Sequence, residues 1–255
     1  MQTRSVLVSA LVVAVLLIGG GTAAYVLFLR GDEVAPLALP SSAPASSAAA
    51  SPAAAGSTRA AASLPASSGA AIAAATIPGT WSIAADSVVG YRVRERLASL
   101  SADSDAVART TSITGTVTIA GSGSGLTVSK ADFSVDMTSL ASDKQQRDNR
   151  LRNQGIETDA FKTSTFTLTQ PATLPAGATT GSAVDVTLHG DLTLHGVTKT
   201  VDIPAKAQLN GNLVQVQGTL SFPFSDYSIV APNIGGFVTV QDNGTLEFLV
   251  NLTKA

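Results

Sequence analysis

The chain contains the run Gly190-Asp191-Leu192-Thr193-Leu194-His195-Gly196-Val197-Thr198-Lys199, which predicts two β-strands that meet at a glycine. Apolar residues alternate with polar ones on both sides of that glycine, at Val186, Leu188, Leu192, Leu194, Val201 and Ile203. Period-two alternation is typical of a strand that buries one of its faces. Gly196 allows a backbone conformation that a side chain would forbid. The run therefore predicts two half-buried strands joined by a turn at Gly196.

The same β pattern extends from Trp81 to the C-terminus. Short alternating runs, each bounded by Gly, Pro, Asn or Asp, occur at 89–93, 113–119, 133–137, 166–168, 184–188, 192–194, 201–203, 214–216, 220–224, 237–240 and 246–252. Strands at this spacing, without helices between them, indicate an antiparallel barrel or sandwich. The segment 142–152 lacks the alternation and predicts a short surface helix. Ser142 or Asp143 would cap its start, and Arg150 and Arg152 would lie near its negative end.

The N-terminal residues predict a membrane anchor at 1–31. No charged residue occurs from Ser5 to Leu29, and a helix of that length crosses a hydrocarbon core of about 30 Å. Arg4 precedes the apolar run, so we expect the N-terminus in the cytoplasm and the rest of the chain exported. A signal peptide cleaved near Thr22-Ala23-Ala24 is the alternative, although its apolar region would normally be only about 7–15 residues long.

Residues 32–78 differ sharply in composition from the β-rich part that follows. Alanine, serine and proline dominate, and few large side chains are available for burial. Such a segment cannot offset the entropy lost on ordering, and its prolines disfavour a continuous helix. We therefore expect a disordered linker at 32–78, followed by one β-domain at 79–255.

Composition excludes several classes of function. The net charge of the 255-residue chain is -2, so no large basic field is available to attract nucleic acid. The absence of cysteine excludes disulfides and thiolate chemistry. His189 and His195 are six residues apart, about 20 Å along an extended strand, and could not share a metal ion there. Neither a Gly-x-Ser-x-Gly elbow nor a phosphate-binding glycine loop before a helix is present. We expect neither catalysis nor a cofactor.

Three arginines, Arg92, Arg94 and Arg96, share one face of the first strand, opposite Tyr91 and Val93. They would contact an anion or a lipid head group, or they would belong to a solvated outer face. The sequence leaves both interpretations open.

The order of motifs along residues 80–255 resembles the YceI-like family of lipocalin-like barrels. The stretches that carry the resemblance are Trp81-Ser-Ile83, Asp86–Glu95, Phe133–Leu140, Ser142-Asp-Lys144, Arg147–Arg152, Phe161–Phe166 and, as the strongest match, Gly190–Lys199. Lys162 stands where that family usually has a proline. In the late element Ser225-Asp-Tyr227, Phe224 replaces the usual arginine and Ser228 the usual glycine.

The resemblance implies an all-β fold, an eight-stranded antiparallel barrel with a short helix and an elongated apolar cavity. It also implies an apolar partner, such as a polyisoprenoid or an isoprenoid quinone, because some family members hold such molecules. Each methylene group buried in such a cavity would contribute about 0.8 kcal/mol. The candidate lining residues are Tyr91, Val93, Phe133, Val135, Phe166, Leu192, Leu194, Phe222, Phe224 and Phe248. Their alternative role is that of an ordinary solid core.

The sequence thus favours a membrane-tethered binding protein on the extracytoplasmic side, holding an apolar isoprenoid-type lipid. The alternative localisation is secretion after signal cleavage. The alternative function is a structural or adhesive cell-envelope domain whose barrel is filled by side chains. No constellation of residues supports a third possibility, an envelope hydrolase.

Overall fold

The computed structural model describes residues 34–40, 77–97, 103–123, 125–234 and 238–255. The expected anchor at 1–31 and most of the expected linker at 32–78 lie outside these residues. Residues 34–40 contain no helix or strand. Within the described ranges, none of the helices has both the length and the apolar character needed to cross a bilayer.

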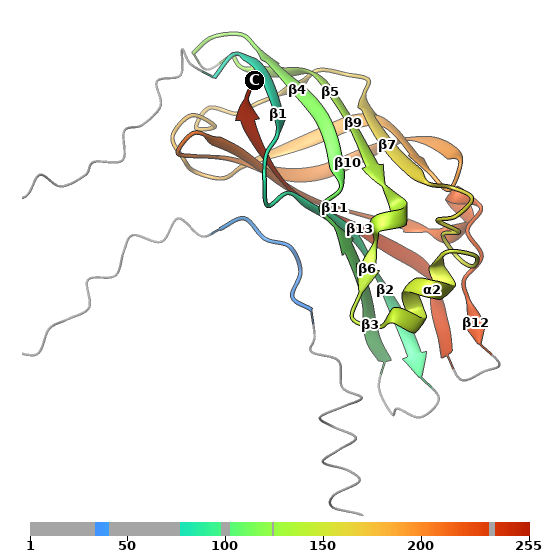
Figure 1. Ribbon diagram of the computed structural model, residues 1–255. Coiled ribbons are helices and arrows are strands. Elements are labelled where there is room, and N and C mark those ends of the chain that lie inside the picture. Colours follow the sequence, from blue (N-terminus) through green and yellow to red (C-terminus); the bar gives the residue numbers. More distant parts are fainter. Residues whose placement is uncertain (1–33, 41–76, 98–102, 124, 235–237) are drawn as a thin grey trace, which may run out of the picture. The chain divides into compact units, whose positions relative to one another are not determined.

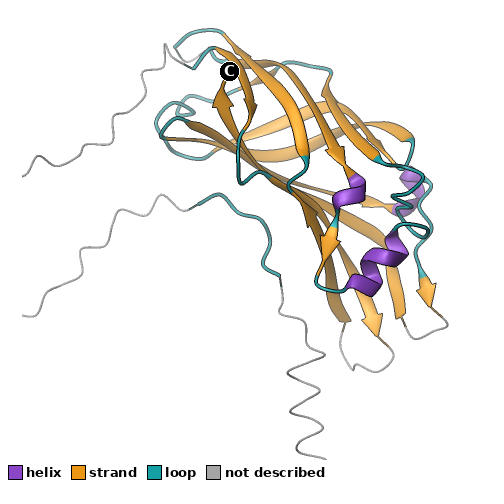
Figure 2. Cartoon of the chain, viewed as in Figure 1, coloured by secondary structure: helices purple, strands orange, loops and turns teal. Residues whose placement is uncertain are grey.

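The strands in the described part of the chain form a sheet that closes on itself (Figures 1 and 2). Each strand of the ring is antiparallel to its neighbours. The ring runs β1 (Gly79–Ile83), β4 (Ile113–Ala120), β5 (Thr127–Asp136), β7 (Thr163–Leu168), β9 (Val184–Leu194), β10 (Val197–Asn210), β11 (Leu213–Pro223) and β13 (Val238–Lys254). Pairing of β1 with β13 closes it. The predicted eight-stranded antiparallel barrel is confirmed.

At two neighbouring positions of the ring, the strand is extended by a second strand that is adjacent to it in the sequence. Strand β1 continues after a bend as β2 (Val88–Leu97), and β3 (Asp103–Thr110) leads into β4. Strand β2 pairs with both β13 and β3. Three two-residue strands pair at the margins: β6 (Ala141–Ser142) with β3, β8 (Ala172–Thr173) with β5, and β12 (Asn233–Ile234) with β13. The alternation pattern does not predict β3, because acidic residues occupy two of its first three positions.

The turn at Gly196 forms as predicted. Leu194 pairs with Val197, so His195 and Gly196 are the two central residues of a tight hairpin turn. Their φ angles are 51° and 73°, the left-handed values that such turns require and that match the twist of the adjoining strands. A Cβ atom at Gly196 would also lie 2.7 Å from the ring of Phe161.

The contacts of His195 explain how a non-glycine residue is held at positive φ. Its Nδ1 lies 3.0 Å from the carbonyl oxygen of Tyr227, and its Nε2 lies 2.9 Å from Oε2 of Glu157. His189, on β9, instead pairs through Nδ1 with Asp202 at 2.7 Å. The expectation of one continuous strand through both histidines is wrong, because β9 ends at Leu194. Each histidine has its own structural partners.

The predicted surface helix is α2 (Gln145–Leu151), but its expected cap is wrong. The residue before the helix is Lys144, and no side chain caps it. Instead, Asp148 within the helix accepts a hydrogen bond from the backbone N–H of Ser142 at 3.0 Å. Two strands also end sooner than expected, because η2 (Met137–Ser139) and η3 (Phe224–Tyr227) are 3-10 turns.

Glycines on the strands set the positions of aromatic rings inside the barrel. A Cβ atom would lie 2.6 Å from the ring of Phe166 at Gly190, 2.5 Å from that of Phe248 at Gly218, and 2.8 Å from that of Phe224 at Gly244. Real Cβ atoms do not approach so closely. The absence of a side chain therefore lets each ring lie close against a strand of the sheet.

We predict that Gly190→Ala destabilises the barrel. Its Cβ would lie 2.4 Å from the carbonyl oxygen of Thr167 as well as against Phe166, so strand or ring must shift. Overpacking of this kind lowers the free energy of unfolding by about 1–3 kcal/mol, measurable by urea denaturation. Gly125→Ala is the control, because the nearest atom is 3.5 Å away, and we expect a change within about 0.5 kcal/mol. Equal stability of the two variants would contradict the prediction.

Candidate ligand-binding cavity

The barrel encloses a cavity of about 590 Å³, lined by side chains from β2, β4, β5, β7, β9, β10, β11 and β13. This volume lies within the range of about 300–1,000 Å³ typical of small-molecule sites. Nearly all of the wall is aliphatic or aromatic. An eight-stranded barrel is just wide enough to be filled by side chains or to hold one slender ligand. Here the space is left open.

The structure places all ten predicted lining residues on the cavity wall. Four of them, Phe166, Leu192, Leu194 and Phe224, are buried. The other six, which also face inward, remain partly accessible: Tyr91, Val93, Phe133, Val135, Phe222 and Phe248. Inward-facing side chains keep accessible surface when the interior between them is hollow, so the barrel is not the filled core of the alternative interpretation. Their contact with a ligand stays a prediction.

One end of the cavity carries polar side chains that were not among the predicted lining residues. They are Glu95, Lys144, Gln146, Arg147, Arg150 and Gln154. Glu95 follows Tyr91 and Val93 on the inward face of β2, so strict alternation along that strand was the signal that pointed to it. The other five come from α2 and its flanks, and no alternation marks them.

An ion pair joins α2 to the barrel at this end. Nη2 of Arg147 lies 2.7 Å from Oε1 of Glu95, whose side chain is 9% exposed. Nη1 of Arg147 contacts Asp143. Burial lowers the pKa of Arg147, but the carboxylates of Glu95 and Asp143 outweigh that effect and raise the pKa above its ordinary value. Arg147 is therefore a fixed cation that both carboxylates already neutralise.

Helix α2 forms a loosely anchored cover over the polar end. None of its seven residues is fully buried. Besides the Arg147–Glu95 pair, the bond from Ser142 to Asp148 ties the helix to the sheet. In Figure 1 the helix lies beside β6 and β3, at the end of the barrel that also holds β12. The opposite end of the cavity is apolar and is lined by Ile77, Leu126, Leu174 and Leu209.

Two buried tyrosine hydroxyls have no hydrogen-bond partner among the described residues, those of Tyr91 and Tyr227. Burial raises the pKa of Tyr91, and raises that of Tyr227 to about 12. Both groups are therefore neutral phenols at physiological pH. Leaving such a group unpaired costs about 1–3 kcal/mol. Tyr91 lines the cavity, whereas Tyr227 does not.

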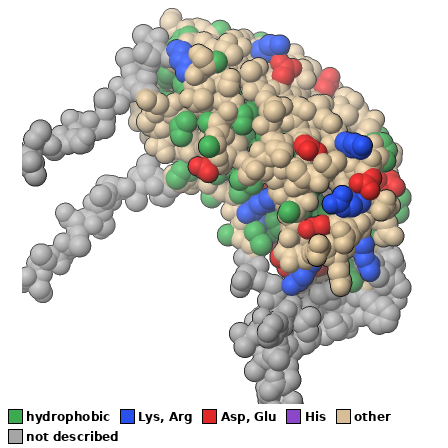
Figure 3. Space-filling model, in the orientation of Figure 1, with side chains coloured by type: hydrophobic (Ala, Val, Ile, Leu, Met, Phe, Trp, Pro, Cys, Tyr) green, Lys and Arg blue, Asp and Glu red, His purple; other side chains and the backbone are tan. Residues whose placement is uncertain are grey.

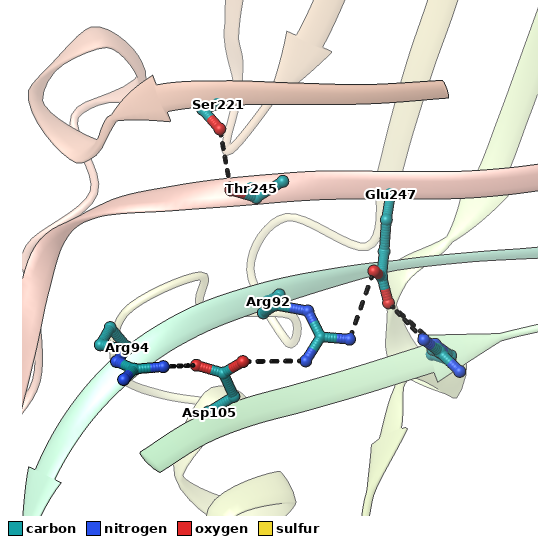
Figure 4. Close-up of polar contacts among 7 residues, drawn as sticks. Arg92, Arg94, Asp105, Ser221, Thr245 and Glu247 are labelled. Carbon is teal, nitrogen blue, oxygen red and sulfur yellow. Dashed lines mark hydrogen bonds and ion pairs between the residues drawn. The ribbon is translucent and has the colours of Figure 1, made fainter. Parts of the chain in front are cut away.

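The three arginines of β2 lie on the outer face, and each pairs with a carboxylate of β3. Arg92 and Arg94 both contact Asp105, at 3.0 and 2.9 Å, and Arg96 contacts Asp103 at 2.9 Å. Arg92 also reaches Glu247 of β13 at 3.5 Å, and Ser221 contacts Thr245 nearby (Figure 4). On the face shown in Figure 3, basic and acidic side chains are likewise interspersed. This pairing favours a solvated outer face over an anion site.

Glu247 is 1% exposed although it lies on the outside of the barrel. It pairs in register with Gly90, where an added Cβ would lie 2.8 Å from the side chain of Arg109. Arg92 and Arg109 cover it, with Nη2 of Arg109 at 2.7 Å. The two guanidinium groups thus enclose the carboxylate and tie β13 to β2 and β3.

The described residues hold no group of three or more histidine, aspartate or glutamate side chains able to bind a metal ion. The site therefore consists of an apolar tube with a polar, charge-paired end. Such a site can bind an apolar molecule by the hydrophobic effect, because the molecule leaves water and contacts aliphatic and aromatic side chains.

Comparison with known proteins identifies the family. The family model described as YceI-like domain matches residues 81–252, so the chain belongs to that family. A UPF0312 protein of Vibrio vulnificus (strain YJ016) is 31% identical over 123 residues, 46% of this chain and 61% of that protein. A UPF0312 protein of Vibrio parahaemolyticus is 34% identical over 119 residues, 44% of this chain and 60% of that protein. The match thus spans less than two thirds of these curated relatives.

A solved structure shares the fold. It is a polyisoprenoid binding domain from Saccharophagus degradans, 20% identical, with a TM-score of 0.51, and the match covers 70% of this chain and 99% of that one. At this identity the likeness shows the arrangement of strands and nothing further.

We predict that Arg147→Met destabilises the protein, because the Glu95 carboxylate is left buried without its partner. The free energy of unfolding should fall by about 1–3 kcal/mol, measured by denaturant titration. Adding Glu95→Gln should restore much of the loss. In the control Arg152→Met, the lost ion pair with Asp159 is 3.8 Å long and about half exposed, so the change should stay within about 0.5 kcal/mol. A similar effect of both substitutions would show that the Glu95 pair has no special role.

Proposed function

We propose that this protein binds an apolar isoprenoid-type lipid, such as a polyisoprenoid or an isoprenoid quinone, inside the barrel. The observation that carries the proposal is the 590 Å³ interior with its almost wholly apolar wall. An isoprenoid chain is slender, uncharged and insoluble in water. Each of its buried methylene-sized groups would contribute about 0.8 kcal/mol. The polyisoprenoid binding domain from Saccharophagus degradans, built on the same fold, supports the choice of ligand.

The ten inward-facing residues named from the sequence are the proposed ligand contacts. Phe166, Phe224 and Phe248 pack closely against glycines of the sheet, so this part of the wall is formed without a ligand. A preformed wall lowers the entropy cost of binding. In this proposal the protein acts as a carrier or store and has no catalytic step.

We further propose that the barrel is held at the outer side of a membrane by an anchor at residues 1–31. The uncharged run 5–29 and the Ala/Ser/Pro-rich segment after it support this arrangement. An anchor would keep the cavity close to a lipid source. A secreted form, cleaved after the apolar run, is the alternative.

We expect an isoprenoid lipid to co-purify with the full chain. Organic extraction of the purified protein, followed by mass spectrometry, should recover it at near one lipid per chain. A protein that carries no lipid and takes up none when isoprenoids are added would instead support the structural or adhesive alternative.

A variant that narrows the cavity sharpens this test. Val93→Trp would displace about three methylene-sized groups of the ligand and lower its affinity by more than about tenfold. Thr219→Trp is the matched control, because Thr219 is exposed on β11. Both variants should keep the circular dichroism spectrum of the parent. Equal lipid content in the two would argue against binding inside the barrel.

Membrane attachment has its own test. The full chain should sediment with membranes and resist extraction by salt, whereas removal of residues 1–31 should release the barrel domain, because the apolar run is then lost. N-terminal sequencing of the mature protein distinguishes an anchor from a signal peptide. Recovery of the intact full chain in a soluble fraction would refute tethering.

A further inference from the structure

The α2 end of the cavity is electrically balanced. Four charged side chains line it, the acidic Glu95 and the basic Lys144, Arg147 and Arg150, and the carboxylates of Asp143 and Asp148 lie beside them. Their formal charges sum to zero. A cavity end built to hold a phosphate would instead present an excess of unpaired cations. Two of the three cations on the wall already pair with carboxylates, Lys144 with Asp143 at 3.5 Å and Arg147 with Glu95 at 2.7 Å, which favours a neutral group at this end.

Arg147, the best buried of these cations, is already engaged. One of its nitrogens contacts Glu95 at 2.7 Å, and the other contacts Asp143 and lies 3.4 Å from Oγ of Ser142. An anionic head group would have to displace one of the two carboxylates and leave it unpaired. That exchange is unfavourable for Glu95, which is buried.

The hydroxyl of Tyr91 is the unsatisfied group near this end. Tyr91 pairs in register with Ala108, and Ala108 pairs with Ser142, whose backbone N–H is bonded to Asp148 of α2. The ring thus lies on the cavity wall two strands from the point where α2 joins the sheet. The charges of Arg147, Asp148 and Glu95 all act on its pKa, which agrees with this placement. Its oxygen is enclosed and bonds to no described residue.

We infer that the α2 end of the cavity receives a neutral oxygen on the lipid, a hydroxyl or a quinone carbonyl, and that Tyr91 is its hydrogen-bond partner. The apolar chain then extends toward Leu126 and Leu209 at the opposite end. A phenol both donates and accepts, so it suits either oxygen. The head group reaches the enclosed hydroxyl by shifting α2, none of whose residues is fully buried. This inference rests on the proposed function and adds the orientation and head-group class of the ligand.

The test uses three probes with one common chain: geranylgeraniol, its phosphate monoester, and the hydrocarbon with hydrogen in place of the hydroxyl. Their dissociation constants are measured on the delipidated full chain. The parent protein should bind the alcohol about three- to tenfold more tightly than the hydrocarbon, the gain of one net hydrogen bond. The phosphate should bind no better than the alcohol. Tyr91→Phe should abolish the preference for the alcohol and leave the affinity for the hydrocarbon unchanged.

Tyr227→Phe is the matched control, because it removes a buried, unpartnered hydroxyl that does not line the cavity. It should leave the preference for the alcohol intact. Neither substitution should lower the melting temperature, since each deletes a buried group that lacks a partner.

The outcomes separate this inference from the proposed function. Equal binding of alcohol and hydrocarbon, or equal effects of the two tyrosine substitutions, would refute the Tyr91 subsite while the lipid-binding function stands. Tightest binding of the phosphate would refute the neutral head group. Failure of all three probes to bind would overturn the proposed function itself.

Discussion

Closure of the sheet between β1 and β13 is the constraint on which the rest of the structure depends. The last residues of the described chain pair with the first strand of the domain, Trp81 with Lys254 and Ile83 with Leu252. With that pairing, both edges of the eight-strand ring are satisfied, and the number of strands sets the radius of the barrel. Residues that alternate along each strand must then face a common interior. The cavity results from closure of the sheet together with inward-facing side chains that do not fill the space inside the barrel.

The aromatic residues show how an apolar wall can be large and still leave space. Phe166, Phe224 and Phe248 lie over glycines of neighbouring strands and are thereby kept against the wall. All three rings also belong to the cavity wall. A glycine beneath each ring thus allows a large apolar side chain to lie close to the strand.

The two faces of β2 illustrate opposite uses of charge. Outside, the arginines and the carboxylates of β3 form a paired network near solvent, with Glu247 enclosed beneath Arg92 and Arg109. Inside, the single carboxylate of Glu95 accepts an arginine that arrives on α2. The outer pairs stabilise neighbouring strands, while the inner pair attaches a helix over the end of the cavity. The cavity therefore has one polar end and one apolar end, so a ligand with a polar group and an apolar chain would bind in one orientation.

The amino-acid sequence by itself determined the class of fold, the hairpin turn at Gly196 and the ten residues that face inward. These features are local. Alternation assigns each side chain to a face of the strand, and a tight hairpin turn needs residues that adopt the left-handed backbone conformation. It did not reveal β3, whose acidic residues obscured the alternation until their arginine partners on β2 were known. Only the tertiary structure decided that the barrel is hollow, because alternation names the inward face without measuring the gap across it. It alone also brought Arg147 to Glu95, because the two residues are 52 positions apart in the sequence and no short-range pattern encodes where α2 packs on the barrel.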